Sequence, residues 1–237
     1  MPRNAAELEA RIGYTFKNKK LLEEALTHSS YANELKLKKK SVACNERLEF
    51  LGDSVLSIIV SEYLFEKYSK QPEGDLTKLR AAVVQSGALC SYAREIELGD
   101  YLYLGNGEEK NNGRDRQSNL ENAFEALLAA IYLDAGDTGK KAVQAFLMPF
   151  VVREIKKTEC DGLHSDYKTE LQQLIQQEEG DYLEYVTVSE RGPDHNKTFE
   201  VEARLNSNVL GTGTGRTKRE AEQNAAKAAL RLFGRIK

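Results

Sequence analysis

Residues 45–59 carry acidic side chains at a spacing that could hold a divalent metal ion. On a helix, at about 100° per residue, this segment separates into two faces. The apolar face, which we expect to be buried, contains Leu48, Leu51, Val55, Ile58 and Ile59. The opposite face contains Glu46, Glu49, Phe50, Asp53 and Ser57. Because Glu49 and Asp53 are like charges four residues apart, they destabilise an isolated helix unless a cation lies between them.

Helix geometry alone leaves two interpretations of the acidic face. The simpler one is a solvated surface with one stray aromatic side chain, Phe50, and geometry by itself favours it. The sharper one is a metal site beside a contact surface. Carboxylate oxygens are the ligands that Mg²⁺ prefers, and the chain has no histidine and cysteine cluster to suggest another metal.

A second predicted helix, residues 118–132, carries another candidate carboxylate. Its buried side would consist of Leu120, Phe124, Leu127 and Ile131. Its other side carries Asn122, Glu125, Ala126 and Ala129. The small alanines would let another helix approach closely, so we expect Glu125 to point at the face that carries Glu49 and Asp53.

Length and composition fit an ordinary globular protein. The 237 residues allow one large domain or two modest ones, and 41% of them are hydrophobic and 30% charged. No stretch approaches the ~18 apolar residues of a membrane span, and the N-terminus lacks the apolar run of a signal peptide. The cysteines Cys44, Cys90 and Cys160 have no metal-ligand or redox spacing. We therefore expect a cytoplasmic protein that does not associate with membranes.

The net charge of −3, taken alone, argues against a nucleic-acid partner. The C-terminal part does not change this, because 11 Lys and Arg residues face 12 Asp and Glu residues from Ser165 onward. Any nucleic acid must therefore bind to local basic patches rather than to a general positive field.

Hydrophobic periodicity predicts an all-helical block up to residue 156. The expected helices are 5–11, 19–34, 45–68, 76–96 with a break near Gly87, 118–132 and 140–156. Residues 99–113, rich in Gly and Asn, are expected to form a loop. Its glycines are not followed by Gly-Lys-Ser/Thr, so we expect no nucleotide cofactor. His28 is a lone histidine, and such residues are more often structural than catalytic.

The pattern changes after a short polar linker, residues 157–164. A helix over residues 166–178 is followed by three segments with the period-two alternation of strands and by a final helix. The expected strands are 183–191, 198–205 and 209–215, and the final helix is 217–232.

The sequence Asn45-Glu46-Arg47-Leu48-Glu49-Phe50-Leu51-Gly52-Asp53-Ser54-Val55-Leu56 closely resembles the signature of the ribonuclease III family of double-stranded RNA endonucleases. Residues 26–34 and 73–80 also resemble segments of that family. The α-β-β-β-α order at the C-terminus resembles a double-stranded RNA-binding domain. The resemblance extends over about residues 5 to 235. It implies an all-α endonuclease domain at residues 1–156, the linker at 157–164, and a small α+β RNA-binding domain at 165–237.

The resemblance also implies a chemistry. Glu49, Asp53 and Glu125 match the metal-binding and catalytic acids of the family, Glu46 is an outer member of the same catalytic face, and Glu73 is a weaker candidate. Two Mg²⁺ ions, for which Mn²⁺ can substitute, would assist phosphodiester hydrolysis to 5′-phosphate and 3′-hydroxyl ends. The substrates would be double-stranded RNAs, including ribosomal RNA precursors.

One metal-ligand position departs from the family. Asn122 lies where the family has an aspartate, and an amide oxygen can coordinate Mg²⁺ but brings no charge. A unit charge ~4 Å away is worth about 4 kcal/mol at an effective dielectric of ~20, before desolvation offsets part of it. We therefore expect the chain to bind duplex RNA but to cleave it poorly. Asn122 could be a deliberate substitution or a feature of a naturally attenuated variant, and the sequence does not separate these two explanations.

A second hypothesis from another class follows from the same residue. The chain could be a double-stranded RNA-binding protein that holds RNA without cutting it, its acidic site disabled by Asn122. A metal phosphohydrolase of small substrates would leave the C-terminal domain unexplained, and we set it aside.

Phe50 also has a role by resemblance. In the family this aromatic side chain inserts into a second subunit, which implies a homodimer in which each subunit cuts one RNA strand. Twofold interfaces are the commonest kind in homo-oligomers.

Three groups of C-terminal residues are candidates for RNA contact by resemblance to such domains. The first helix offers Thr169, Gln172 and Gln173, and the loop between the first two strands offers His195 and Lys197. Arg216, Lys218 and Arg219 surround the start of the final helix, where phosphate binding is favourable. Glu222 occupies a position that is basic in many such domains. Each of these residues alone resembles an ordinary surface residue, and only their joint placement supports RNA binding.

Overall fold

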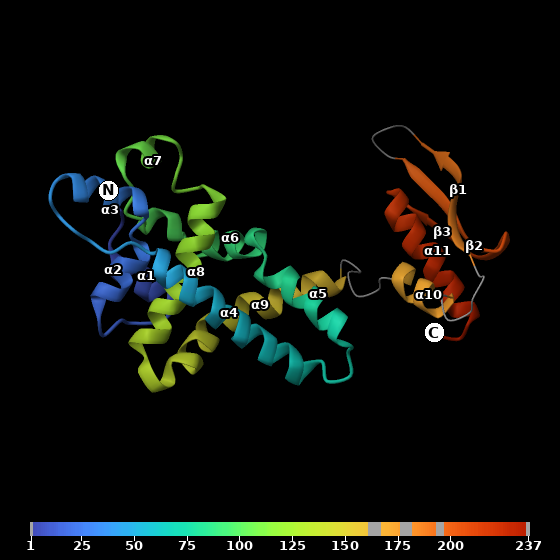
Figure 1. Cartoon of the computed structure of the whole chain (residues 1–237), viewed down its shortest axis with the longest axis horizontal. Coiled ribbons are helices and arrows are strands. Elements are labelled where there is room, and N and C mark those ends of the chain that lie inside the picture. Colours follow the sequence, from blue (N-terminus) through green and yellow to red (C-terminus); the bar gives the residue numbers. More distant parts are fainter. Residues whose placement is uncertain (1, 161–166, 176–181, 193–196, 236–237) are drawn as a thin grey trace. The chain divides into compact units, whose positions relative to one another are not determined.

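A computed structural model describes residues 2–160, 167–175, 182–192 and 197–235 (Figure 1). The chain divides into two compact units, Met1–Asp161 and Gly162–Lys237. The first is all helical, and the second is a three-stranded sheet with helices, so the predicted fold class is confirmed. Among the described residues, none of the helices combines the length and the apolar character needed to span a bilayer.

The N-terminal unit contains nine α-helices among its described residues. They are α1 (Ala5–Ile12), α2 (Lys19–Leu26), α3 (Ser29–Leu37), α4 (Glu46–Lys67), α5 (Glu73–Val84), α6 (Ser86–Glu95), α7 (Asn106–Lys110), α8 (Gln117–Asp134) and α9 (Gly139–Cys160). Two short 3₁₀ turns, Leu98–Tyr101 and Gly136–Thr138, follow α6 and α8.

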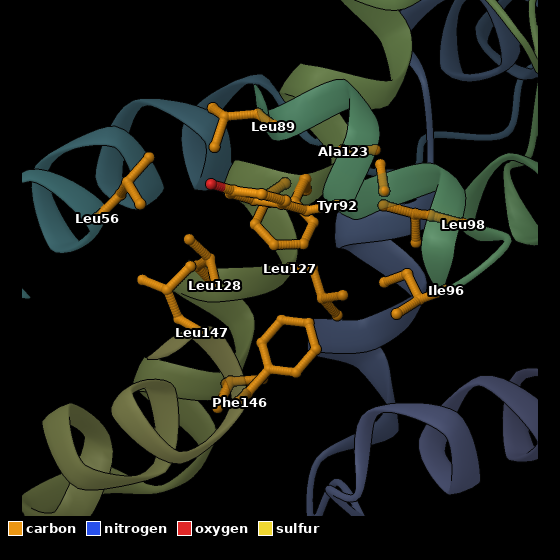
Figure 2. Packing of buried hydrophobic residues seen from close by; sticks show 14 of the residues in the cluster. Leu56, Leu89, Tyr92, Ile96, Leu98, Ala123, Leu127, Leu128, Phe146 and Leu147 are labelled. Carbon is orange, nitrogen blue, oxygen red and sulfur yellow. The ribbon is translucent and has the colours of Figure 1, made fainter. Parts of the chain in front are cut away.

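Helix α8 is the centre of this unit, and it packs against α2, α4, α6 and α9. Residues 126–131 are all buried, which is the pattern of a helix surrounded by other helices. Aromatic side chains from three helices meet beside it: Tyr92 lies 5.8 Å from Phe124, and Phe124 lies 5.7 Å from Phe146, between ring centroids. Figure 2 shows how leucines such as Leu56 and Leu147 fill the same core.

Helices α4 and α8 approach closely at Gly52. A Cβ atom at this glycine would lie 1.9 Å from the backbone oxygen of Glu125, so only glycine fits there without a shift of the backbone. The alanines Ala126 and Ala129 are fully buried. The predicted close approach of another helix to the alanine side of α8 is therefore confirmed.

Some sequence predictions are wrong in detail. Ile58, expected in the core, is 61% exposed. It lines a surface hollow between α4 and α5 with Phe65 and Leu76. The expected helix 19–34 is two helices, since Thr27 leaves helical geometry to pair with Tyr103.

The remaining differences concern helix limits. The break expected near Gly87 lies at Gln85, between α5 and α6. The expected loop at 99–113 contains the short helix α7. Helix α9 extends to Cys160, so the first four residues of the expected linker are helical.

His28 is structural in this fold, as its isolation in the sequence indicated. Its Nδ1 atom accepts a hydrogen bond from the Ser30 backbone N–H at 3.2 Å and lies 2.8 Å from the Ser30 hydroxyl. The histidine thereby caps the N-terminus of α3.

The C-terminal unit contains α10 (Tyr167–Ile175), β1 (Leu183–Arg191), β2 (Thr198–Leu205), β3 (Asn208–Gly215) and α11 (Lys218–Leu232). The strands form an antiparallel sheet in the order β1-β2-β3. Glycines at alternate positions of β3 face α11, and a Cβ at Gly213 would lie 2.1 Å from the Ala225 backbone nitrogen. The helix therefore lies directly on the strand, over a core that includes Leu171 and Val201.

Candidate active site

The acidic residues of α4 lie along its solvent-facing side. Glu46 and Asp53 are exposed, and Glu49 between them is half-buried. The Gly52 contact holds the backbone of Glu125 against α4. Because Gly52 is the residue next to Asp53, this contact brings the carboxylates of two helices to one place.

Electrostatics shows how close these groups are. Burial, and then the negative charges of Asp53, Glu121 and Glu49, raise the pKa of the Glu125 carboxyl to about 8. Burial also raises the pKa of Glu49, with contributions from Glu46 and Glu121. Like charges disfavour each other's ionised form when they share a site, so the structure gathers these acids into one cluster.

Glu121 is a member of this cluster that sequence reasoning missed. It lies one helical turn before Glu125 on α8 and is half-buried. Its carboxylate accepts a hydrogen bond from the Ser86 hydroxyl at the start of α6. Ser86 in turn accepts a hydrogen bond from the Gln117 amide at 2.9 Å. The spacing of four residues before Glu125 was the one signal available in the sequence.

Two other candidates lie differently. Asn122 is half-buried on α8 and follows Glu121 in the sequence. Glu73 is exposed at the start of α5, where its carboxylate accepts a hydrogen bond from the Thr77 hydroxyl at 2.8 Å. Glu73 is not among the groups that raise the pKa of Glu125 or Glu49, so the structure does not couple it to the cluster.

The cluster suits a hard divalent cation. Its donors are carboxylate and amide oxygens, and its most buried carboxylate, that of Glu125, is surrounded by like charges. Within the described part of the chain, no group of three or more His, Cys, Asp or Glu side chains is placed so that it could hold a metal ion by itself. An open group of carboxylates is what Mg²⁺ uses when it keeps several of its waters.

The expected RNA-contacting residues of the C-terminal unit are on its surface. Thr169, Gln172 and Gln173 are exposed on α10. Arg216, Lys218 and Arg219 are exposed around the start of α11. Thr217 caps this helix by accepting a hydrogen bond from the Glu220 backbone N–H at 3.1 Å.

Not all of the candidate cations project freely into solvent. The Lys218 ammonium lies 2.8 Å from the Glu190 carboxylate and 5.6 Å from the centre of the Phe199 ring. The hydrogen bond from Lys218 lowers the pKa of Glu190, and the charge of the half-buried Lys197 adds to this effect. His195 lies outside the described residues.

Glu222, at the position that is basic in many such domains, forms an ion pair with Lys168 at 2.7 Å. The ammonium of Lys168 also lies 4.4 Å from the centre of the Tyr185 ring. The two side chains join α10 to α11, so Glu222 has a structural partner in this fold.

Comparison with known proteins decides the family. A model described as ribonuclease-III-like matches residues 18–153, and a double-stranded RNA binding motif matches residues 167–232. The chain belongs to the ribonuclease III family of endoribonucleases. The two matched segments fall on the helical unit and on the sheet-containing unit.

Relatives support this assignment over nearly the whole chain. A protein named Ribonuclease 3 from Caldanaerobacter subterraneus is 49% identical over 97% of this chain and 98% of its own length. Ribonuclease 3 from Pelotomaculum thermopropionicum is 47% identical over 94% of this chain and 90% of its own length. The crystal structure of the nuclease domain of ribonuclease III from Campylobacter jejuni is 42% identical, with a TM-score of 0.54, over 66% of this chain and 96% of that chain.

This ribonuclease III also carries an exposed apolar strip on α4. Phe50 is 79% exposed, Ile58 61% and Phe65 73%. At about 100° per residue these three positions lie within about 80° of each other around the helix axis. Large exposed apolar areas in a folded domain mark contact surfaces, so this strip is a candidate contact surface.

Proposed function

We propose that this ribonuclease III hydrolyses double-stranded RNA at the acidic cluster between α4 and α8, with Mg²⁺ as its metal and Mn²⁺ as a substitute. The observation that carries the proposal is the half-buried Glu125 carboxyl, whose pKa is raised to about 8 by burial and by its acidic neighbours. Strongly shifted pKa values cluster at functional sites, and the oxygen donors around this carboxyl are of the kind that Mg²⁺ binds.

We propose a separate role in metal binding for each residue of the cluster. Glu49, Asp53 and Glu125 would hold the metal ions through carboxylate oxygens, Asn122 through its amide oxygen, and Glu46 would lie at the rim. When bound, the metal supplies an activated water and neutralises the charge of the leaving oxygen. The products would carry 5′-phosphate and 3′-hydroxyl ends.

The raised pKa of Glu125 also predicts that metal binding is coupled to the release of a proton. In the metal-free protein near neutral pH, Glu125 holds its proton, because its ionised form is disfavoured by burial and by Asp53. A cation at the site reverses this preference, so metal binding releases the proton. Metal affinity should therefore rise with pH.

The C-terminal unit would bind the duplex by its shape. Double-stranded RNA-binding domains contact two successive minor grooves and the phosphates between them. We propose that Thr169, Gln172 and Gln173 face one minor groove, that His195 and Lys197 face the other, and that Arg216, Lys218 and Arg219 contact phosphates. Lys218 would then exchange Glu190 for a phosphate.

We also propose a homodimer with Phe50 at the interface, supported by the exposed apolar strip on α4. One of the solved structures similar to this chain, the nuclease domain from Campylobacter jejuni, concerns flexibility in a region involved in dimer formation. A cytoplasmic location and action on ribosomal RNA precursors stay predictions from the sequence.

Asn122 lowers the negative charge of the site, and we propose that it weakens metal binding and slows cleavage. The test compares this chain with its Asn122→Asp variant on a long RNA duplex, with Mg²⁺ or with a chelator, and with a single strand of the same sequence as control. We expect slow cleavage of the duplex by the chain and cleavage about tenfold faster or more by the variant.

The other outcomes are equally informative. Equal rates would show that the amide is a sufficient ligand and that the charge argument is wrong. If neither protein cuts while both bind the duplex, the hypothesis of a non-cleaving RNA-binding protein replaces the endonuclease proposal.

A further inference from the structure

Glu190, near the end of β1, is placed by an irregularity of the sheet. The pairing of β1 with β2 shifts by one residue at Val188, which is a β-bulge. Glu190 therefore lies opposite Phe199 of β2, where a regular strand would place Ser189. Bulges of this kind redirect the side chains that follow them.

The bulge turns Glu190 toward the side of the sheet that α11 covers. Residues directly opposite each other in an antiparallel pair have their side chains on the same face. The half-buried Phe199 packs against the core between the sheet and α11. Glu190 shares that face but is exposed, so its carboxylate lies at the border of the core, beside the start of α11.

Lys218, on the first turn of α11, meets this pair from the helix. Its ammonium lies 2.8 Å from a carboxylate oxygen of Glu190 and 5.6 Å from the centre of the Phe199 ring. An ammonium group binds a carboxylate and a phosphate in the same way, by donating charge-assisted hydrogen bonds to anionic oxygens. The Glu190 carboxylate thus occupies a position on Lys218 that an RNA phosphate could take.

The other groups at the start of α11 leave Lys218 in a special position. Thr217 accepts a hydrogen bond from the Glu220 backbone N–H at 3.1 Å, and the Glu220 carboxylate accepts one from the Arg216 backbone N–H at 2.7 Å. This capping box satisfies two backbone donors, so phosphate binding depends more on cationic side chains. Of Arg216, Lys218 and Arg219, only Lys218 forms an ion pair with another described residue.

We propose that Glu190 competes with RNA phosphates for Lys218, so that this ion pair lowers the affinity for duplex RNA and weakens its dependence on salt. The inference rests on the proposed function of Lys218 as a phosphate contact. To reach a phosphate, Lys218 must leave Glu190, and the released carboxylate then lies near a second anion. Both effects oppose binding.

The salt dependence distinguishes this role from a structural one. Each phosphate that a free cation neutralises releases counterions, which steepens the fall of log K with log salt by about 0.9. A lysine that Glu190 already neutralises adds less to this slope. An ion pair that only joined β1 to α11 would affect stability and would leave the slope unchanged.

The test measures binding of the full chain to a fluorescent RNA duplex by anisotropy, at a series of KCl concentrations and in a chelator. Glu190→Gln keeps the shape of the side chain and removes its charge. We expect binding to be about two- to fivefold tighter at low salt. The slope should steepen by up to about one, so that the difference shrinks as salt rises.

Two further changes show whether the effect acts through Lys218. Lys218→Gln should weaken binding, and adding Glu190→Gln to it should change the affinity less than Glu190→Gln does alone. Glu200→Gln is the matched control, because Glu200 is next to Phe199 on the opposite face of the sheet and accepts a hydrogen bond from Ser189 at 3.1 Å. This control should leave RNA binding unchanged. Thermal unfolding checks that each variant is folded.

Unchanged affinity and slope in folded Glu190→Gln would overturn the inference and leave the ion pair as a link between β1 and α11. Equal tightening by Glu200→Gln would also overturn it, because a general charge effect would then explain the result. If Lys218→Gln binds weakly while Glu190→Gln has no effect, only the inference fails. If Lys218→Gln binds as tightly as the unaltered chain, the proposed phosphate contact itself is wrong.

Discussion

At the scale of single residues, Glu125 is held where a carboxylate is costly to ionise. Its backbone lies against Gly52, and Asp53, Glu121 and Glu49 surround its side chain with negative charge. In the absence of metal, the folded protein therefore binds the Glu125 proton more tightly than the unfolded chain does. This difference makes stability depend on pH.

We predict the direction of that dependence from the pKa values of 4.5 in the unfolded chain and about 8 in the fold. The proton's stabilising effect is complete below about pH 4.5 and is lost as the pH rises through about 8. In a chelator, the free energy of unfolding of the helical unit should fall by about 2 kcal/mol over this range. The full value of about 1.4 kcal/mol per pKa unit is not reached, because Glu125 keeps some contact with water.

Urea unfolding at a series of pH values, followed by circular dichroism, checks this prediction. The matched variant is Glu125→Gln, which keeps the shape but cannot titrate, and its stability should fall less between about pH 5 and pH 8. Identical slopes for the two proteins would contradict the buried position of Glu125 among like charges.

At the scale of elements, the contact of α4 with α8 positions the site. It depends on Gly52, where a methyl group would meet the Glu125 backbone oxygen at 1.9 Å. We predict that Gly52→Ala pushes the two helices apart and destabilises the helical unit by about 3 kcal/mol, in the range of overpacked cores. Thermal unfolding measures the loss, and metal binding should weaken as well.

Gly87→Ala is the matched control for this change. Gly87 is exposed on α6, and a Cβ there has no neighbour within 4 Å. Because alanine is the better helix former, this variant should be more stable by about 0.5 to 1 kcal/mol. Equal effects of the two substitutions would mean that helix propensity, and not the α4–α8 contact, explains the Gly52 result.

The sequence predicted the positions of the helices and strands better than it predicted which other elements pack against them. The period of residues 45–68 placed Leu48, Val55 and Ile59 in the core correctly, because each depends only on position around one helix. Ile58 was misplaced because its exposure depends on which neighbouring elements cover that side of α4, and no local pattern records this. The break at Thr27 depends on its pairing with Tyr103, far along the chain.

The same limit applies to the site. Glu125 could be predicted to face α4, because alanines beside a carboxylate on an apolar helix indicate a close helix neighbour. The hydrogen bond that holds Glu121 could not be predicted in this way, since its partner Ser86 lies 35 positions away in sequence. The spacing of residues along the sequence predicts which side chains share one side of a helix. Contacts between different helices can be identified only from the three-dimensional structure.

At the scale of the whole molecule, the apolar strip of Phe50, Ile58 and Phe65 predicts self-association. We expect the chain to sediment as a dimer at micromolar concentration and Phe50→Ala to shift it toward the monomer, because the substitution removes a large apolar contact. Leu37→Ala is the control, since Leu37 is 87% exposed on α3 and outside the strip. An undisturbed dimer in Phe50→Ala would refute this interface, as would a chain that sediments only as a monomer.

The central claim is that the carboxylates between α4 and α8 carry out metal-dependent cleavage of duplex RNA. Its most direct test measures cleavage and binding of one RNA duplex in Mg²⁺ by the chain and by Glu125→Gln. Glu125 is in the helical unit, and the duplex-binding residues that we propose are in the C-terminal unit. We therefore predict that the variant binds normally and that its cleavage falls by about a hundredfold or more. Cleavage by Glu125→Gln at the rate of the unaltered chain would contradict the account.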